Sequence, residues 1–293
     1  MPIEWREYNM VNLDEFRGVI DNTIQILTIP EGTKKIKPKI FYECSQMTSV
    51  TIPESVETIG DNAFYKCSSL KKVVIPNLIT QIERNTFYLC SSLEEIILPP
   101  NLIRIMDNAF TSCQALTTIE LPPNIVWIGA YAFSNCSSLT TINIPTTISV
   151  LNSNVFWSCS SLNNVVVPSN VESLEISAFQ SCTSMTNITL NEGLKSIGAQ
   201  VFSGCTNLLN ITIPSTVNSI GTTSLTTITT ATFNQPAGME ITLPTAGSSS
   251  GMFYHKTARN LTVYTDNETI KNYDYATDNV TVTLYHLDGT LWE

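Results

Sequence analysis

Charged side chains are scarce in this sequence of 293 residues. Only 14% of the residues are Asp, Glu, Lys or Arg, against roughly 25% in an ordinary globular protein. The net charge is −10, and no Lys or Arg occurs between Arg104 and Lys195. Sequence-independent binding to nucleic acid needs a basic surface, so the composition excludes nucleic acid as a partner.

Long apolar runs are also missing. No stretch approaches the roughly 18 consecutive apolar residues of a membrane-spanning helix. Residues 1–8 contain no basic segment followed by an apolar run. We therefore expect no secretory signal and no membrane insertion.

Catalytic motifs are absent as well. The two histidines, His255 and His286, lie in an irregular C-terminal part, and no glycine-rich phosphate loop or H-E-x-x-H motif occurs. The neighbouring acids Glu94 and Glu95 point to opposite faces of a strand, so they cannot share a substrate. The sequence predicts that the protein is not an enzyme and has no cofactor or metal site.

A repeat of 23 residues dominates the chain. Cysteine, phenylalanine and proline each recur at this step. The cysteines are Cys44, Cys67, Cys90, Cys113, Cys136, Cys159, Cys182 and Cys205; the phenylalanines are Phe41, Phe64, Phe87, Phe110, Phe133, Phe156, Phe179 and Phe202; the prolines are Pro30, Pro53, Pro76, Pro99, Pro122, Pro145, Pro168 and Pro214, with Asn191 replacing one of them. A fixed period of this length predicts a solenoid.

One unit shows how a turn of the solenoid is built. Leu70, Val73 and Ile75 follow the L-x-x-L-x-L spacing, and their alternation predicts a short strand with one face inward. Pro76 ends the strand because it has no amide hydrogen for the ladder. Ile79 and Ile82 then return to the interior on the opposite side.

The ends differ from the regular array. Residues 12–20 predict a short helix with Asn12 as its N-cap, so residues 1–23 are either a cap or a docking arm. Residues 24–214 are the regular repeats, beginning with a strand at 24–29. Residues 215–293 are interpreted as degenerate repeats plus a C-terminal cap, or as a small domain of their own. They contain expected strands at 241–244, 261–264 and 280–285, and a helical turn or two at 268–273.

The full pattern, C-S-S-L-x-x-I-x-I-P-x-x-V-x-x-I-G-x-x-A-F-x-x-C, resembles the 23-residue BspA-like leucine-rich repeat over about residues 24–235. The resemblance implies a leucine-rich-repeat solenoid, mainly β, curved and right-handed, with a parallel sheet on its concave face. It also implies binding rather than catalysis, because many members resemble surface proteins that attach to host proteins or to other cells.

The cysteines allow three interpretations. All eight occupy one apolar repeat position, which favours a ladder of buried thiols. Disulfides between neighbouring rungs are disfavoured because the Cβ vectors are parallel. A metal site is disfavoured because each rung presents a single ligand.

We expect a ligand to bind the exposed face of the predicted strands. Val74 and Ile97 are neighbouring apolar residues that could anchor a partner, although strand propensity alone also accounts for Val, Ile and Thr there. The candidate ligand-binding residues form two columns: Lys72, Glu95, Thr118, Thr141, Asn164 and Asn187 in one, and Val74, Ile97, Glu120, Asn143, Val166 and Thr189 in the other.

The sequence therefore predicts a non-enzymatic module for recognition or adhesion, with a protein or glycan as its partner and the cell surface suggested by the resemblance. The alternative is a structural spacer or a subunit of a larger assembly, such as a phage tail or surface layer. Replacing Phe133 by Ala is expected to cost roughly 3–5 kcal/mol, and replacing Phe233, which is outside the register, far less.

Overall fold

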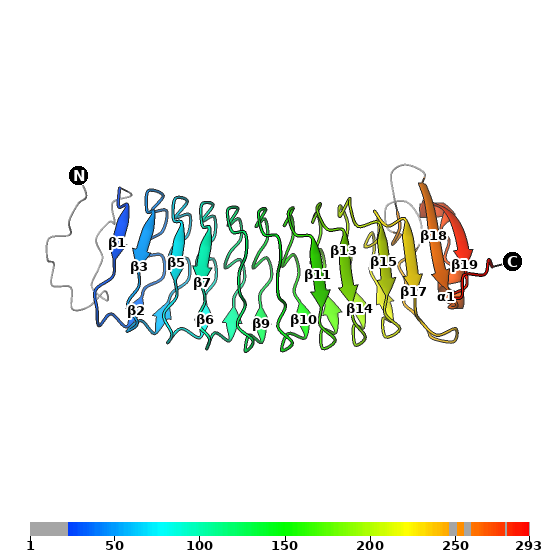
Figure 1. The fold of residues 1–293 in the computed structure, drawn as a ribbon, viewed down its shortest axis with the longest axis horizontal. Coiled ribbons are helices and arrows are strands. Elements are labelled where there is room, and N and C mark those ends of the chain that lie inside the picture. Colours follow the sequence, from blue (N-terminus) through cyan, green and yellow to red (C-terminus); the bar gives the residue numbers. More distant parts are fainter. Residues whose placement is uncertain (1–22, 246–250, 255–258, 279, 293) are drawn as a thin grey trace.

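A computed structural model describes residues 23–245, 251–254, 259–278 and 280–292. These residues form a mainly-β parallel solenoid of about 11 turns with almost no helix. Figure 1 shows the turns as a single row of stacked rungs that follow one another in chain order. The helix expected at 12–20 lies outside the described residues, and the curvature and handedness implied by the resemblance stay predictions.

One side of the row carries the strands that the sequence predicts. We call this the major sheet. All its pairings are parallel, with a 23-residue offset through the regular repeats, so equivalent residues lie side by side. Its strands are β1 (Ile26–Thr28), β3 (Ser49–Thr51), β5 (Lys72–Val74), β7 (Glu95–Ile97), β11 (Asn164–Val167), β13 (Asn187–Leu190), β15 (Asn210–Ile213), β17 (Thr230–Phe233), β18 (Arg259–Thr265) and β19 (Val280–Tyr285).

A second column of two-residue strands runs along another side of the rungs and pairs in three separate segments; we call it the minor sheet. Its members place one residue outward and the next, an Ile or Leu, into the core. The sequence predicts the buried residues here but not a sheet. The strands are β2 (Lys35–Ile36), β4 (Thr58–Ile59), β6 (Gln81–Ile82), β8 (Arg104–Ile105), β9 (Trp127–Ile128), β10 (Val150–Leu151), β12 (Ser173–Leu174), β14 (Ser196–Ile197) and β16 (Ser219–Ile220).

The core between the sheets is a set of ladders. The rings from Phe41 to Phe202 stack with centroids 5.2 to 6.1 Å apart. Beside them, each cysteine from Cys67 onward donates its S–H to the carbonyl of a phenylalanine in the preceding rung, as Cys136 does to Phe110 over 3.1 Å. The rungs are therefore held in register by both apolar and polar contacts.

The turn around each phenylalanine needs left-handed backbone. Asn62 and Lys66, on either side of Phe64, have φ of 58° and 57°. Alternate amides here, those of Asn62, Phe64 and Lys66, donate to carbonyls of the next rung, as Phe64 N–H does to the Thr86 carbonyl over 2.9 Å. Asn tolerates this conformation better than most residues, which explains its recurrence before the phenylalanine.

The parallel stack continues past the regular repeats through β17, β18 and β19. Leu225 and Ile228, which replace the phenylalanine and cysteine of the pattern, are fully buried. The helical turn expected at 268–273 is α1 (Glu268–Lys271), with Asn267 as its N-cap. The strand expected at 241–244 is wrong, because only an isolated bridge joins Thr242 to Ser219.

Phe233 also differs from expectation. It lies on β17, is fully buried, and packs its ring edge-on against Phe253. The prediction that replacing Phe233 by Ala costs little stability rested on its position outside the 23-residue register. That premise is wrong, because Phe233 lies in the core.

Candidate functional site

The major sheet presents both predicted columns to solvent. Burial alternates along each rung, so that Val73 is buried while Lys72 and Val74 are exposed. All twelve candidate residues occupy such exposed positions. Where a strand forms, its alternation above a packed core fixes the direction of these side chains.

Four candidates form a compact cluster on β5 and β7. Lys72 and Glu95 are register partners and their side chains make an ion pair of 2.9 Å. Val74 and Ile97 are the next register pair on the exposed face, and each is 45% exposed. This group, which we call the β5/β7 cluster, sets an apolar pair directly beside an exposed ion pair.

A second set of four lies on β11 and β13, further along the row. Asn164 pairs in register with Asn187, and Val166 with Thr189. Val166 is 58% exposed. Because two rungs separate this set from the β5/β7 cluster, the two sets could contact one ligand only if it is extended.

The two rungs between these sets depart from the prediction. Thr118, Glu120, Thr141 and Asn143 take the exposed positions, but no strand forms there. Thr140 N–H donates to the Thr117 carbonyl over 3.0 Å, but no backbone hydrogen bond joins residues 118–121 to residues 141–144. A continuous sheet across all rungs is therefore wrong, although the alternation of burial continues.

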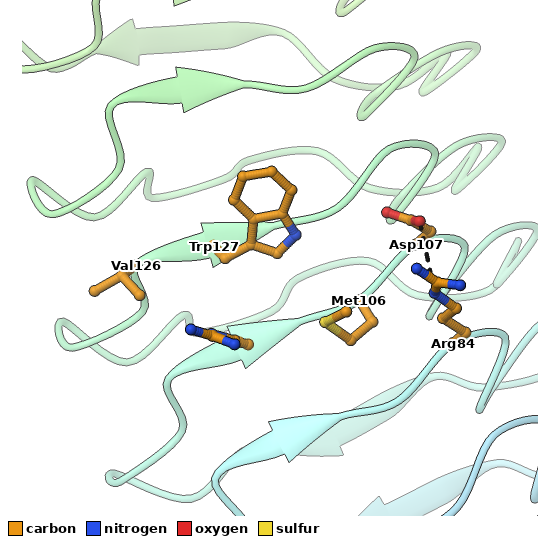
Figure 2. Close-up of a pocket in the computed structure, with 6 residues that line it drawn as sticks. Arg84, Met106, Asp107, Val126 and Trp127 are labelled. Carbon is orange, nitrogen blue, oxygen red and sulfur yellow. Dashed lines mark ion pairs between the residues drawn. The ribbon is translucent and has the colours of Figure 1, made fainter.

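The minor sheet carries a hollow that was not predicted from the sequence. It measures about 350 Å³ and Figure 2 shows its side chains around β8 and β9. We call it the Trp127 hollow. Its lining residues are Arg84, Arg104, Met106, Asp107, Val126 and Trp127. The signal was available in the repeat: Trp127 stands where other rungs have Lys35, Thr58, Gln81, Ser173, Ser196 or Ser219.

A shallower feature lies near the N-terminal rungs. The rings of Tyr42, Tyr65 and Tyr88 stack with centroids 4.6 and 4.9 Å apart. Lys66 makes a 3.0 Å ion pair with Glu43 beside them. Because stacked rings cover each other's faces, little of this aromatic surface is open to a ligand.

The cysteines are part of the packed core. All eight are free and buried. Burial raises the pKa of Cys44 to about 11 and that of Cys136 to about 12, so neither thiol ionises near neutral pH. Among the described residues, no group of three or more His, Cys, Asp or Glu side chains could hold a metal ion.

Of the two histidines, His255 lies outside the described residues. His286 places its Nδ1 2.9 Å from Asp266 and stacks its ring on Trp292 at a centroid distance of 3.6 Å. The first contact joins the end of β19 to the residue that follows β18, and the second joins it to the C-terminal tail. They give this histidine a role in closing the solenoid.

Comparison with known proteins agrees with the repeat. Residues 20–126 and 103–226 match the model of the BspA type leucine rich repeat region, in 6 copies, and no catalytic family is indicated. No curated protein matches the chain. No helix in the described ranges is both long and apolar enough to cross a membrane.

Several solved structures are similar. A leucine-rich repeat protein from Bacteroides ovatus is 25% identical, with a TM-score of 0.75 and coverage of 91% of this chain and 70% of that one. A leucine rich cell surface protein from Faecalibacterium prausnitzii is 22% identical, with a TM-score of 0.53 and coverage of 90% and 73%. The first of these extends over nearly all the rungs described above.

Proposed function

The chain belongs to the BspA-type leucine-rich repeat family, and from this premise we propose that it is a non-enzymatic recognition module that binds a protein or a glycan through the major sheet. The observation that carries the proposal is the β5/β7 cluster. Val74 and Ile97 form an exposed apolar pair beside the ion pair of Lys72 and Glu95. Apolar anchors within a polar rim are the arrangement found at binding hot spots.

Rigidity supports the same function. Each side chain of the β5/β7 cluster and of the set on β11 and β13 stands on a strand whose other face is in the core, so a ligand meets a surface that is already ordered. Binding then costs little conformational entropy. The Lys72–Glu95 pair itself is solvent-exposed and stabilises the fold by less than about 1 kcal/mol, which leaves both charges available to a partner.

We include a surface location in this proposal, because recognition of host or cellular partners requires one. Labelling of intact source cells with an antibody to the chain tests it. Signal only after the cells are opened would contradict the surface location while leaving the binding role untouched.

The binding role is tested by screening the purified chain against extracellular proteins and glycans by surface plasmon resonance. The Val74→Asp/Ile97→Asp double variant is expected to bind a ligand found in this screen at least about tenfold more weakly. The reason is that an apolar anchor worth about 1.4 kcal/mol of binding free energy is replaced by charge. An acidic residue is compatible with the fold at this position, since Glu120 occupies it in a later rung.

A matched control keeps the result specific. Ile176 is 51% exposed outside both sheets, and other rungs have Asp61 or Asp107 at its repeat position. Ile176→Asp should bind like the wild type. Absence of any hit, together with multimers in light scattering, would favour the structural role in an assembly instead.

A further inference from the structure

We propose that the Trp127 hollow is a second binding site, which takes a carboxylated sugar ring of a glycan, a hexuronic or sialic acid unit. The site is on the minor sheet and does not depend on the proposed role of the major sheet. It combines an open aromatic ring, a free guanidinium and a fixed carboxylate within two neighbouring rungs (Figure 2).

The apolar part of the hollow is not required by the fold. Trp127 is 41% exposed, Val126 48%, and Ile103, one rung before Val126, 42%. Elsewhere in the column of Ile103 and Val126 the residues are polar or charged, including the ion pairs Lys34–Glu57 and Glu172–Lys195, each of 2.9 Å. Half-buried Val150 follows Trp127 in its own column, so the apolar island spans three rungs of a face that is otherwise polar. An exposed apolar patch of this kind marks binding.

The arginines of the regular repeats are concentrated at the hollow. Arg84 and Arg104 are the two arginines of residues 24–214, and both line this hollow. Arg104 is the register partner of Trp127, and its exposed side chain makes no ion pair with any residue that the structure describes. A guanidinium fork matches a carboxylate with two parallel hydrogen bonds.

Asp107 supplies a fixed acceptor. Its Oδ1 accepts a hydrogen bond of 3.0 Å from Ala130 N–H, and its Oδ2 lies 3.8 Å from Arg84 Nε. Gly129 is needed for this placement, because a Cβ there would come within 2.4 Å of Oδ1. The carboxylate is thus held at the rim, where it can accept hydrogen bonds from sugar hydroxyls.

Size and surroundings favour a sugar over a protein partner. A stable protein interface covers about 800 Å² on each side with a continuous apolar centre, whereas this apolar island is bounded on both sides by ion pairs and small polar residues. A hollow of about 350 Å³ suits one ring. The C–H face of a sugar packs on the open indole while its carboxylate meets Arg104 and its hydroxyls meet Asp107.

The test uses calorimetric titration of the full chain with tri-galacturonic acid and with sialyllactose. The methyl-esterified trimer and lactose serve as uncharged counterparts. We expect at least one acidic glycan to bind with a Kd of about 0.1–1 mM and its uncharged counterpart to bind about tenfold more weakly. Nitrogen-15 spectra should show the Trp127 indole N–H shifting on addition of the acidic glycan.

Variants taken from other rungs keep the fold intact. Trp127→Ser copies Ser173 and Arg104→Gln copies Gln81, and each should weaken binding by about tenfold or more. Trp157→Ser, which removes another exposed tryptophan and copies Ser134, should bind normally. So should Val74→Asp/Ile97→Asp, which separates this site from the major sheet.

Several results would overturn the proposal. These are no acidic glycan binding at about 10 mM, equal binding of charged and uncharged sugars, or full binding by Trp127→Ser. Capture of an acidic peptide such as hexaglutamate with no acidic sugar binding would replace the glycan by a protein partner.

Discussion

At the scale of single residues, the ladder cysteine is both a core side chain and a hydrogen-bond donor. The Phe110 carbonyl accepts from the Cys113 N–H in its own rung and from the Cys136 S–H in the next, each over 3.1 Å. The 23-residue period predicts that cysteines are buried neighbours. It could not predict the acceptor, because sequence spacing does not fix the direction of the Cβ–Sγ bond.

Buried thiols make stability depend on alkaline pH. The pKa of Cys136 is raised from 9.0 to about 12 by burial, and that of Cys44 to about 11. Above about pH 9 the unfolded chain loses thiol protons that the folded chain keeps, so the stabilising contribution is full below that pH and declines as pH rises. We expect the urea midpoint of unfolding to fall between about pH 8 and pH 10.5.

An independent measurement checks the cause. Iodoacetamide at about pH 8 should leave the ladder thiols of the folded protein unmodified and should alkylate them in urea, because only the thiolate reacts. A midpoint that stays constant to about pH 10.5, or rapid alkylation of the folded chain, would show that the thiols are accessible in the native state.

At the scale of elements, the phenylalanine ladder carries much of the core. Phe133 stacks between Phe110 and Phe156 with centroids 5.4 and 5.7 Å away, and it is fully buried. Phe133→Ala should lower the free energy of unfolding by about 3–5 kcal/mol. Phe233→Ala should cost a similar amount, since Phe233 is equally buried.

Urea unfolding followed by circular dichroism compares the two variants. Trp157→Ser, at an exposed position, is the control and should change the midpoint little. A mild effect at Phe233 alone would mean that the rung of β17 packs loosely. A mild effect at Phe133 would contradict the ladder itself.

The strands show why prediction from the sequence reached some elements and not others. Alternation over three residues, as in Lys72–Val74, predicts which side chain is buried and which exposed. The minor sheet was not predicted, because two residues such as Arg104–Ile105 are too few to show a period of two. The loss of the ladder at 117–121 and 140–144 has no counterpart in the repeat sequence.

At the scale of the whole molecule, the repeat stacks the rungs so that side-by-side residues in neighbouring rungs are 23 positions apart in the sequence. The repeat alone therefore predicts that the twelve candidate residues lie on one exposed face. The unusual Trp127 is visible in its repeat column, but the hollow itself depends on Asp107, Trp127 and Arg84 meeting across three rungs, which the pattern of the major sheet does not predict. Sites built by departures from the repeat are found by comparing each exposed position along its column.

A solenoid also has ends, and the C-terminal one is closed by its tail. Trp292 donates its indole N–H to the Thr265 carbonyl over 2.9 Å, and its ring lies between His286 and Lys271, whose Nζ is 3.9 Å from the ring centre. Leu291 bridges antiparallel to Tyr285 on β19. The tail therefore covers the edge of the last strand, which would otherwise offer unpaired backbone groups to another chain.

Removing this closure should act locally, because each rung contacts only its neighbours. We expect Trp292→Ala to speed amide hydrogen exchange in β19 and β18 by about tenfold or more, with exchange from β5 to β13 unchanged. The uncovered edge should also give concentration-dependent self-association in light scattering. Faster exchange spread evenly along the chain would instead mean that the solenoid opens as one cooperative unit and that the tail stabilises the whole of it.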